Sequence, residues 1–143
     1  MPTAKVLLVD DEKDFSEVLA ERMQTRGFEV DTVESGAEAL SLIKDKEFDA
    51  VVLDLAMPGM DGIETLKLML GENPDLQIIL LTGHATLEKG VEAVKLGAVD
   101  FLEKPADLET LIGKIKQAQT KKSELFEKRL ADSISNIMKK KGW

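Results

Sequence analysis

The sequence has no cysteine and no apolar run of membrane length. Without cysteine, the 143-residue chain cannot form a disulfide, use a thiolate or build a cysteine-ligated zinc site. It opens without the apolar segment of a secretory signal. No apolar run approaches the roughly 20 residues that a membrane helix needs. We therefore expect a cytoplasmic protein with no membrane partner.

An excess of positive charge is also missing from most of the chain. Residues 1–120 contain 12 Lys and Arg against 24 Asp and Glu, whereas residues 121–143 contain 7 against 3. An acidic body disfavours nonspecific contact with a phosphate backbone, so we expect no direct DNA binding. We interpret the basic run Lys139–Lys141 as a solvated face. The change of character divides the chain into a domain of residues 1–120 and a tail of residues 121–143.

Five short apolar runs alternate with segments of helical spacing. The runs cover residues 5–9, 28–33, 49–54, 77–81 and 98–102. This alternation predicts an α/β fold with a doubly wound, five-stranded parallel sheet in the order 2-1-3-4-5. Gly27, Gly71 and Gly97 are expected at helix ends. In such a sheet the ligand crevice lies at the carboxyl ends of the first and third strands.

Acidic residues stand at those two strand ends. Asp10 and Asp11 follow the first apolar run, and Asp54 ends the third. Like charges this close repel one another unless a cation joins them. Carboxylates in a small site suit Mg²⁺, which keeps some of its water. Asp10 and Asp11 as helix caps are the simpler reading, but capping does not account for the third acid.

A turn follows Asp54. Pro58, Gly59 and Gly62 lie within the next eight residues, and they predict a tight loop that leaves the Asp54 side chain above the sheet. A carboxylate is ionised at neutral pH, so it can attack phosphorus without a general base. The alternative is an aspartate that only forms the turn.

The fourth and fifth runs also end in polar residues. Thr82 offers a hydroxyl and Gly83 a backbone amide to a phosphoryl oxygen, although Thr82 could equally cap the next helix. Lys104 would add an ammonium, and Pro105 fixes the chain beside it, with a cis peptide bond as one form. His84, the only histidine, we interpret as a bystander or as a residue that controls water access.

Together these features resemble the receiver domain of two-component response regulators over residues 4–120. The motifs are Val-Asp10-Asp11-Glu, the Asp54 loop at 53–62, Leu-Thr82-Gly-His-Ala at 81–85 and Phe-Leu-Glu-Lys104-Pro105 at 101–105. Their wording is most similar to receivers of nitrogen-regulator-type transcriptional activators. The resemblance implies a flavodoxin-like fold.

The resemblance also implies roles for the site residues. Asp54 would be the phosphoacceptor. Asp11, Asp54 and the backbone carbonyl of Ala56 would bind Mg²⁺, with Asp10 acting partly through water. Ala56 and His84 occupy positions that, in the family, tune the lifetime of the phosphoryl group.

A switch is the second implication. Thr82 and Phe101 would be the switch pair and Lys104 the phosphoryl contact. In the family, the threonine moves toward the phosphoryl group and the aromatic ring turns inward. This remodels the surface of the fourth helix, fifth strand and fifth helix. Phe101 stands where tyrosine is commoner in the family, so it lacks a hydroxyl.

The expected partner is a sensor histidine kinase or a phosphotransfer protein, with an unknown downstream target. We expect no turnover of an external substrate. The chain would act as a stand-alone regulator or as the amino-terminal part of a transcriptional regulator. A receiver-fold scaffold that works without phosphorylation is the alternative.

The tail carries an apolar stripe of helical spacing that includes Phe126, Leu130 and Ile134. The stripe predicts an amphipathic C-terminal helix that serves as a linker or dimerisation element. If continuous with the helix that starts near Asp107, it would be about 52 Å long. A homodimer through this helix, or through the fourth and fifth helices, is one outcome; packing back on the domain is the other.

Two other families with related chemistry fit less well. A haloacid-dehalogenase-type phosphatase needs a second aspartate two residues after its nucleophile, where this chain has Ala56. A flavodoxin needs a hydroxyl-rich phosphate loop after the first strand, where this chain has Asp10, Asp11 and Glu12. Carboxylates at that point would repel a cofactor phosphate.

Overall fold

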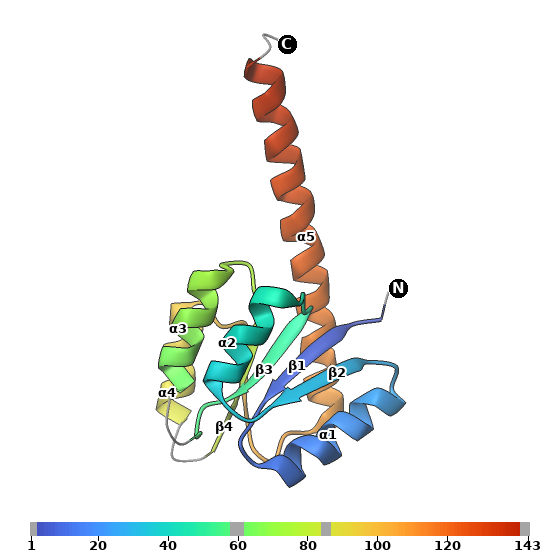
Figure 1. Ribbon diagram of the computed structural model, residues 1–143, viewed down its shortest axis with the longest axis vertical. Helices are drawn as coiled ribbons and strands as arrows, with labels where there is room; N and C mark the ends of the chain where they lie inside the picture. The colour runs from blue at the N-terminus through green and yellow to red at the C-terminus, as the bar shows by residue number, and fades with distance from the viewer. Residues whose placement is uncertain (1–2, 58–61, 84–86, 141–143) are drawn as a thin grey trace.

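The computed structural model describes residues 3–57, 62–83 and 87–140. Strands and helices alternate along the chain, as predicted (Figure 1). The strands are β1 (Lys5–Val9), β2 (Glu29–Val33), β3 (Ala50–Asp54), β4 (Ile78–Thr82) and β5 (Asp100–Glu103). The helices are α1 (Lys13–Thr25), α2 (Gly36–Asp45), α3 (Gly62–Glu72), α4 (Leu87–Leu96) and α5 (Leu108–Lys140).

The five strands form one parallel sheet in the order β2-β1-β3-β4-β5. This confirms the predicted flavodoxin-like, doubly wound topology. All residues of β3 and β4 are buried, because helices cover both faces of the sheet. The carboxyl ends of β1 and β3 therefore meet at one edge, where the strand order reverses.

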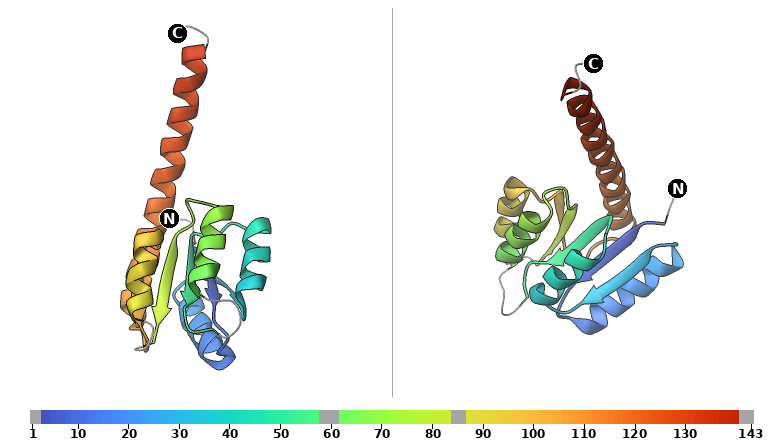
Figure 2. Two further views of the ribbon diagram at one scale, coloured as in Figure 1. Left: turned by 90° about the vertical axis from the view of Figure 1, so that its left-hand side faces the viewer. Right: turned by 45° about the horizontal axis from the view of Figure 1, so that its top comes forward.

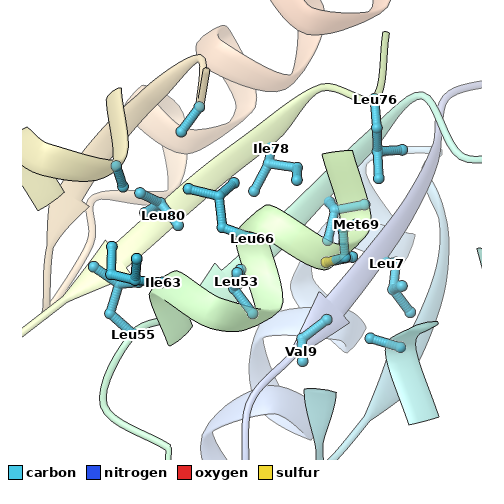
Figure 3. Close-up of a cluster of buried hydrophobic side chains, with 14 of the residues drawn as sticks. Leu7, Val9, Leu53, Leu55, Ile63, Leu66, Met69, Leu76, Ile78 and Leu80 are labelled. Atoms are coloured by element: carbon cyan, nitrogen blue, oxygen red, sulfur yellow. The ribbon is translucent and has the colours of Figure 1, made fainter. Parts of the chain in front are cut away.

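Alternate residues of each central strand enter two separate apolar cores. Leu53 of β3 and Leu80 of β4 face the core under α2, α3 and α4, which includes Leu66 (Figure 3). Val52 and Ile79, their neighbours in the chain, enter the core under α1 and α5. Successive side chains of a strand point to opposite faces of the sheet, so neighbouring residues enter different cores.

Helix ends follow the local sequence in most places. Ser35 caps α2 by accepting the amide of Glu38 at 3.2 Å. Gly27 and Gly97 follow α1 and α4 with φ of 93° and 124°, as expected for left-handed helix termini. Gly71 differs from its prediction, because it lies inside α3 rather than beyond its end.

The spacing of apolar residues correctly predicted the helix α4, but it did not predict which face of the helix is buried. Gly90 and Ala93 are buried against the sheet, whereas Leu87, Val91 and Val94 are exposed. Small residues pack there because α4 approaches the sheet closely. The larger apolar residues form an exposed surface.

Helix α5 continues unbroken past residue 120 and has 33 residues in all, a length of about 50 Å. Its first turns cover the sheet, and its second half extends away from it with no other described helix or strand alongside (Figures 1 and 2). The described part of the tail does not pack back on the domain. Among the described residues, no helix combines the length and apolar character needed to cross a membrane.

Candidate functional site

Two aspartates meet at the carboxyl edge because β1 and β3 are parallel neighbours. Val9 stands opposite Leu53, so the residues that follow them, Asp10 and Asp54, lie at the same level. Both are enclosed, with exposed fractions of 3% and 2%. Buried carboxylates this close repel each other, so the site favours a bound positive charge.

The two aspartates are held in the same way. The amide of Glu12 donates to Asp10 Oδ1 at 2.9 Å, and the amide of Ala56 donates to Asp54 Oδ1 at 3.0 Å. In both cases the donor lies two residues after the aspartate, which is the geometry of an Asx turn. One oxygen of each carboxylate is thus fixed by the backbone. The other, Oδ2, contacts Lys104.

Lys104 supplies one positive charge to both carboxylates. Its Nζ lies 2.9 Å from Asp10 Oδ2, 3.3 Å from Asp54 Oδ2 and 3.3 Å from Glu12 Oε1. The ammonium also lies over the ring of Phe15, 4.4 Å from its centroid, which adds a cation–π contact. One ammonium for three carboxylates leaves the cluster negative.

The end of β5 delivers this lysine. Thr82 is opposite Glu103 in the sheet, and the next amide, that of Lys104, donates to the Thr82 carbonyl at 2.7 Å. The Lys104–Pro105 peptide bond is cis. Lys104 is therefore anchored by its backbone to the strand that neighbours Asp54.

Burial sets the electrostatics of the cluster. Burial raises the pKa of Asp10, aided by the charge of Asp54, and this outweighs the opposing effects of the Glu12 amide and Lys104. Burial lowers the pKa of Lys104, but its hydrogen bond to Asp10 and the charges of Asp54 and Asp10 outweigh burial and raise it. The site therefore favours the charged form of Lys104, whereas it disfavours the charged form of Asp10.

The donor set fits a hard divalent cation. Carboxylate oxygens of Asp10, Glu12 and Asp54 lie within 4.8 Å of one another, and a cation of this kind takes oxygen ligands. Asp11 is exposed and does not belong to this group. The sequence did not predict that Glu12 joins this group, since residue type alone does not tell which acid of the run turns inward. The ligand role of Asp11 comes from the family resemblance and stays a prediction.

The switch pair lies at the next strand ends. Thr82 is fully buried, and its hydroxyl donates to the carbonyl of Leu102 at 3.4 Å. Phe101 is half-buried and packs against the core under α4. Gly83 follows Thr82 and is partly exposed. The threonine hydroxyl is thus occupied within β4 and β5 in this arrangement.

The loop after Asp54 is described only in part. Pro58 and Gly59 lie outside the described residues, as does His84. Gly62 is not in the loop but begins α3, where a Cβ would lie 2.7 Å from the Cα of Leu55. Only glycine permits this approach of α3 to the residue after Asp54.

Comparisons with known proteins agree with this geometry. A family model described as the response regulator receiver domain matches residues 6–116. The receiver domain of NtrX from Brucella abortus has a similar solved structure, with a TM-score of 0.76 and 32% identity, covering 80% of this chain and 98% of that one.

Two longer regulators are similar in sequence. The C4-dicarboxylate transport transcriptional regulatory protein DctD of Rhizobium meliloti (strain 1021) is 34% identical over 124 residues, covering 87% of this chain and 27% of that protein. The regulatory protein AtoC of Escherichia coli (strain K12) is 37% identical over 134 residues, covering 92% and 29%. The chain thus spans less than a third of these two curated relatives. With a family model that matches most of its length, the chain belongs to the response regulator receiver domains of two-component systems.

Proposed function

We propose that this chain is a phosphorylation-dependent switch whose phosphoacceptor is Asp54, and that it turns over no external substrate. The observation that carries the proposal is the placement of Asp54. Its carboxylate is 2% exposed, with one oxygen held by the Ala56 amide and the other 3.3 Å from the Lys104 ammonium. An oriented carboxylate beside a fixed cation suits phosphoryl transfer.

Receiver domains pair with histidine kinases, so the donor we propose is a phosphohistidine. A carboxylate oxygen of Asp54 forms a bond to phosphorus while the phosphorus–nitrogen bond breaks. The released imidazole keeps the electron pair of that bond. The product is an acyl phosphate on Asp54, and Lys104 is placed to neutralise one phosphoryl oxygen.

The reaction is proposed to depend on Mg²⁺. Asp11, Asp54 and the Ala56 carbonyl would hold the ion, with Asp10 acting partly through water and Glu12 as a further carboxylate nearby. An ion held by these residues would supply positive charge to neutralise the transferring phosphoryl group. The negative balance of the cluster supports this dependence, since Lys104 is its one cationic contact among the described residues.

The output is proposed to be a change in the surface of α4, β5 and α5. The phosphoryl group would favour the arrangement in which Thr82 leaves the Leu102 carbonyl and contacts the phosphoryl oxygen, and Phe101 follows. The population shift cannot exceed the difference in free energy with which the group contacts the two arrangements. The exposed apolar residues of α4 support a role for this surface in partner binding.

The tail offers a second contact surface. Phe126, Leu130, Ile134 and Ile137 are each more than half exposed along one side of α5. We propose that this stripe or the α4–α5 surface joins two copies of the chain, or binds a downstream target. Molar mass in solution, compared with that of Ile134→Glu, tests the first of these.

The test of the proposed function is intact mass after incubation with acetyl phosphate, with and without Mg²⁺. We expect one phosphoryl addition that needs Mg²⁺ and is absent from Asp54→Asn. Asp75→Asn, at the opposite edge of the sheet, is the matched control and should be labelled like the wild type. Persistent labelling of Asp54→Asn would sink the assignment. No labelling of any variant would favour a receiver-fold scaffold.

A further inference from the structure

Helix α4 approaches the predicted switch pair so closely at Gly90 that even a methyl group there would require a neighbouring side chain to shift. A Cβ built at Gly90 would lie 3.1 Å from Cγ of the Phe101 ring and 3.1 Å from Cγ2 of Thr82. Carbon atoms in contact prefer about 3.5–4.0 Å. Gly90 does not have a positive φ, so its backbone conformation does not require glycine. What distinguishes glycine at this position is the absence of a Cβ.

Two glycines inside other helices, Gly71 and Gly113, differ from Gly90. A Cβ at Gly71 in α3 or at Gly113 in α5 would meet nothing within 4 Å. Crowding at Gly90 is therefore a local property of the contact between α4 and the strand ends. These two positions supply matched glycine-to-alanine controls within the same molecule.

The two neighbours of Gly90 differ in their freedom to move. Thr82 is fully buried and is held by hydrogen bonds. Its hydroxyl donates to the Leu102 carbonyl, and its own carbonyl accepts from the Lys104 amide. The ring of Phe101 is half-buried, so it has room on its exposed side. A methyl group added at residue 90 would therefore displace the ring outward rather than the threonine.

We propose that Gly90 is a positioning residue of the switch: it leaves the space that the Thr82 methyl group and the Phe101 ring share. The inference rests on the proposed function, since it explains why Thr82 and Phe101 have room to change their arrangement. With the space open, the ring can turn inward when Thr82 moves toward Asp54. With the space filled by a methyl group, the inward arrangement loses more free energy than the outward one, and the population shift shrinks.

The test uses the full chain labelled with fluorophenylalanine and followed by ¹⁹F NMR. The resonance of Phe101 is identified by its absence from Phe101→Leu. The wild type, Gly90→Ala and the controls Gly71→Ala and Gly113→Ala are each treated with acetyl phosphate and Mg²⁺. The change in the Phe101 resonance is divided by the phosphorylated fraction from intact mass, so that weaker labelling cannot imitate a weaker switch.

We expect Gly90→Ala to move the Phe101 resonance before phosphorylation and to reduce its response at least about threefold. The two control variants should respond like the wild type. An equal response in Gly90→Ala and wild type overturns the inference and leaves the proposed function intact. A wild type that accepts no phosphoryl group overturns the proposed function, and the inference falls with it.

A second variant separates crowding from general damage. Thr82→Ser keeps the hydroxyl and removes the methyl group that a residue-90 Cβ would meet. In Gly90→Ala/Thr82→Ser the melting temperature should rise above that of Gly90→Ala, whereas Thr82→Ser alone should not raise it in the wild type. If the double variant gains nothing, crowding against the Thr82 methyl group is not the cause. The proposal that this methyl group shares the space at Gly90 is then wrong, whether or not Gly90→Ala folds well.

Discussion

The two ends of the sheet use the same residue types for different purposes. At the carboxyl edge, Asp10 and Asp54 are almost fully buried and share Lys104. At the amino edge, the partly exposed Asp75 is bonded by Arg129 of the α5 extension, with Nη2 2.9 Å from Oδ1 and Nε on Oδ2.

The pKa values move in opposite directions at the two ends. The hydrogen bond from Arg129 holds the pKa of Asp75 below its ordinary value, whereas burial raises that of Asp10. A carboxylate with its own exposed cation is a structural contact. Two buried carboxylates that share one lysine keep a net negative charge, which favours the binding of a further cation. The two ends differ in how deeply the carboxylates are buried and in whether they share a cation, not in the types of residue present.

The largest effect should come from Lys104→Ala, since it leaves two buried carboxylates without a cation. We expect a loss of about 3 kcal/mol in the free energy of unfolding without metal, partly restored by Mg²⁺. Mg²⁺ should still bind, while the response of the switch is lost. Denaturant melts with EDTA and with Mg²⁺ measure this.

Lys122→Ala is the matched control at the amino edge. Lys122 lies 3.5 Å from Asp49 and 3.9 Å from Glu47, and it is about one-third exposed. Its loss should cost less than about 1 kcal/mol and show no Mg²⁺ rescue. Equal costs for the two lysines would contradict the contrast between the two ends.

Mg²⁺ affinity should distinguish the two acids that follow Asp10. We expect Asp11→Asn to weaken binding at least about tenfold and Glu12→Gln to weaken it less than about threefold. The family resemblance assigns Asp11 as a ligand, whereas the Glu12 side chain is 65% exposed and already contacts Lys104. Isothermal titration measures both, and the reverse ranking would make Glu12 the third ligand.

Removing one charge from each end should change stability with opposite sign. Because the pKa of Asp10 is raised in the folded protein, its charged form is disfavoured at pH 7. Asp10→Asn should therefore stabilise the metal-free protein. Asp75→Asn should destabilise it, because the lowered pKa of Asp75 means that folding favours the charge. Changes of the same sign would break the comparison.

The smallest effect is the pH dependence of the Arg129 contact. The pKa of Asp75 is below 3.8 in the folded protein, so the contact stabilises fully above about pH 4 and is lost as pH falls through the lowered pKa. The difference in unfolding free energy between wild type and Arg129→Gln should follow this curve and shrink in high salt. A difference that does not shrink as the pH falls below the ordinary range of an aspartate would contradict the assignment.

The sequence predicted the elements well, because the five apolar runs are short and clearly bounded. It also placed Asp54 and Lys104 at one edge, since parallel strands end together. It did not predict that Glu12 lies beside Lys104, because the direction of this side chain depends on the turn after β1. The buried face of α4 was missed for another reason: close packing there selects Gly90 and Ala93, which carry little hydrophobic signal.

The continuity of α5 was left open for a physical reason as well. A stripe such as Phe126, Leu130 and Ile134 has the same spacing whether it packs on its own domain, pairs or projects. Ion pairs from Lys122 and Arg129 to the amino edge hold the helix in its projecting direction. These contacts join residues far apart in the sequence, and periodicity contains no information about them.

The most direct measurement of the central claim locates the phosphoryl group. After phosphorylation with acetyl phosphate and Mg²⁺, borohydride reduction converts an aspartyl phosphate to homoserine, which peptide mass analysis can place in the sequence. We predict homoserine at residue 54 and at no other aspartate. Homoserine at Asp10, Asp11 or another site, with residue 54 unchanged, would contradict the account.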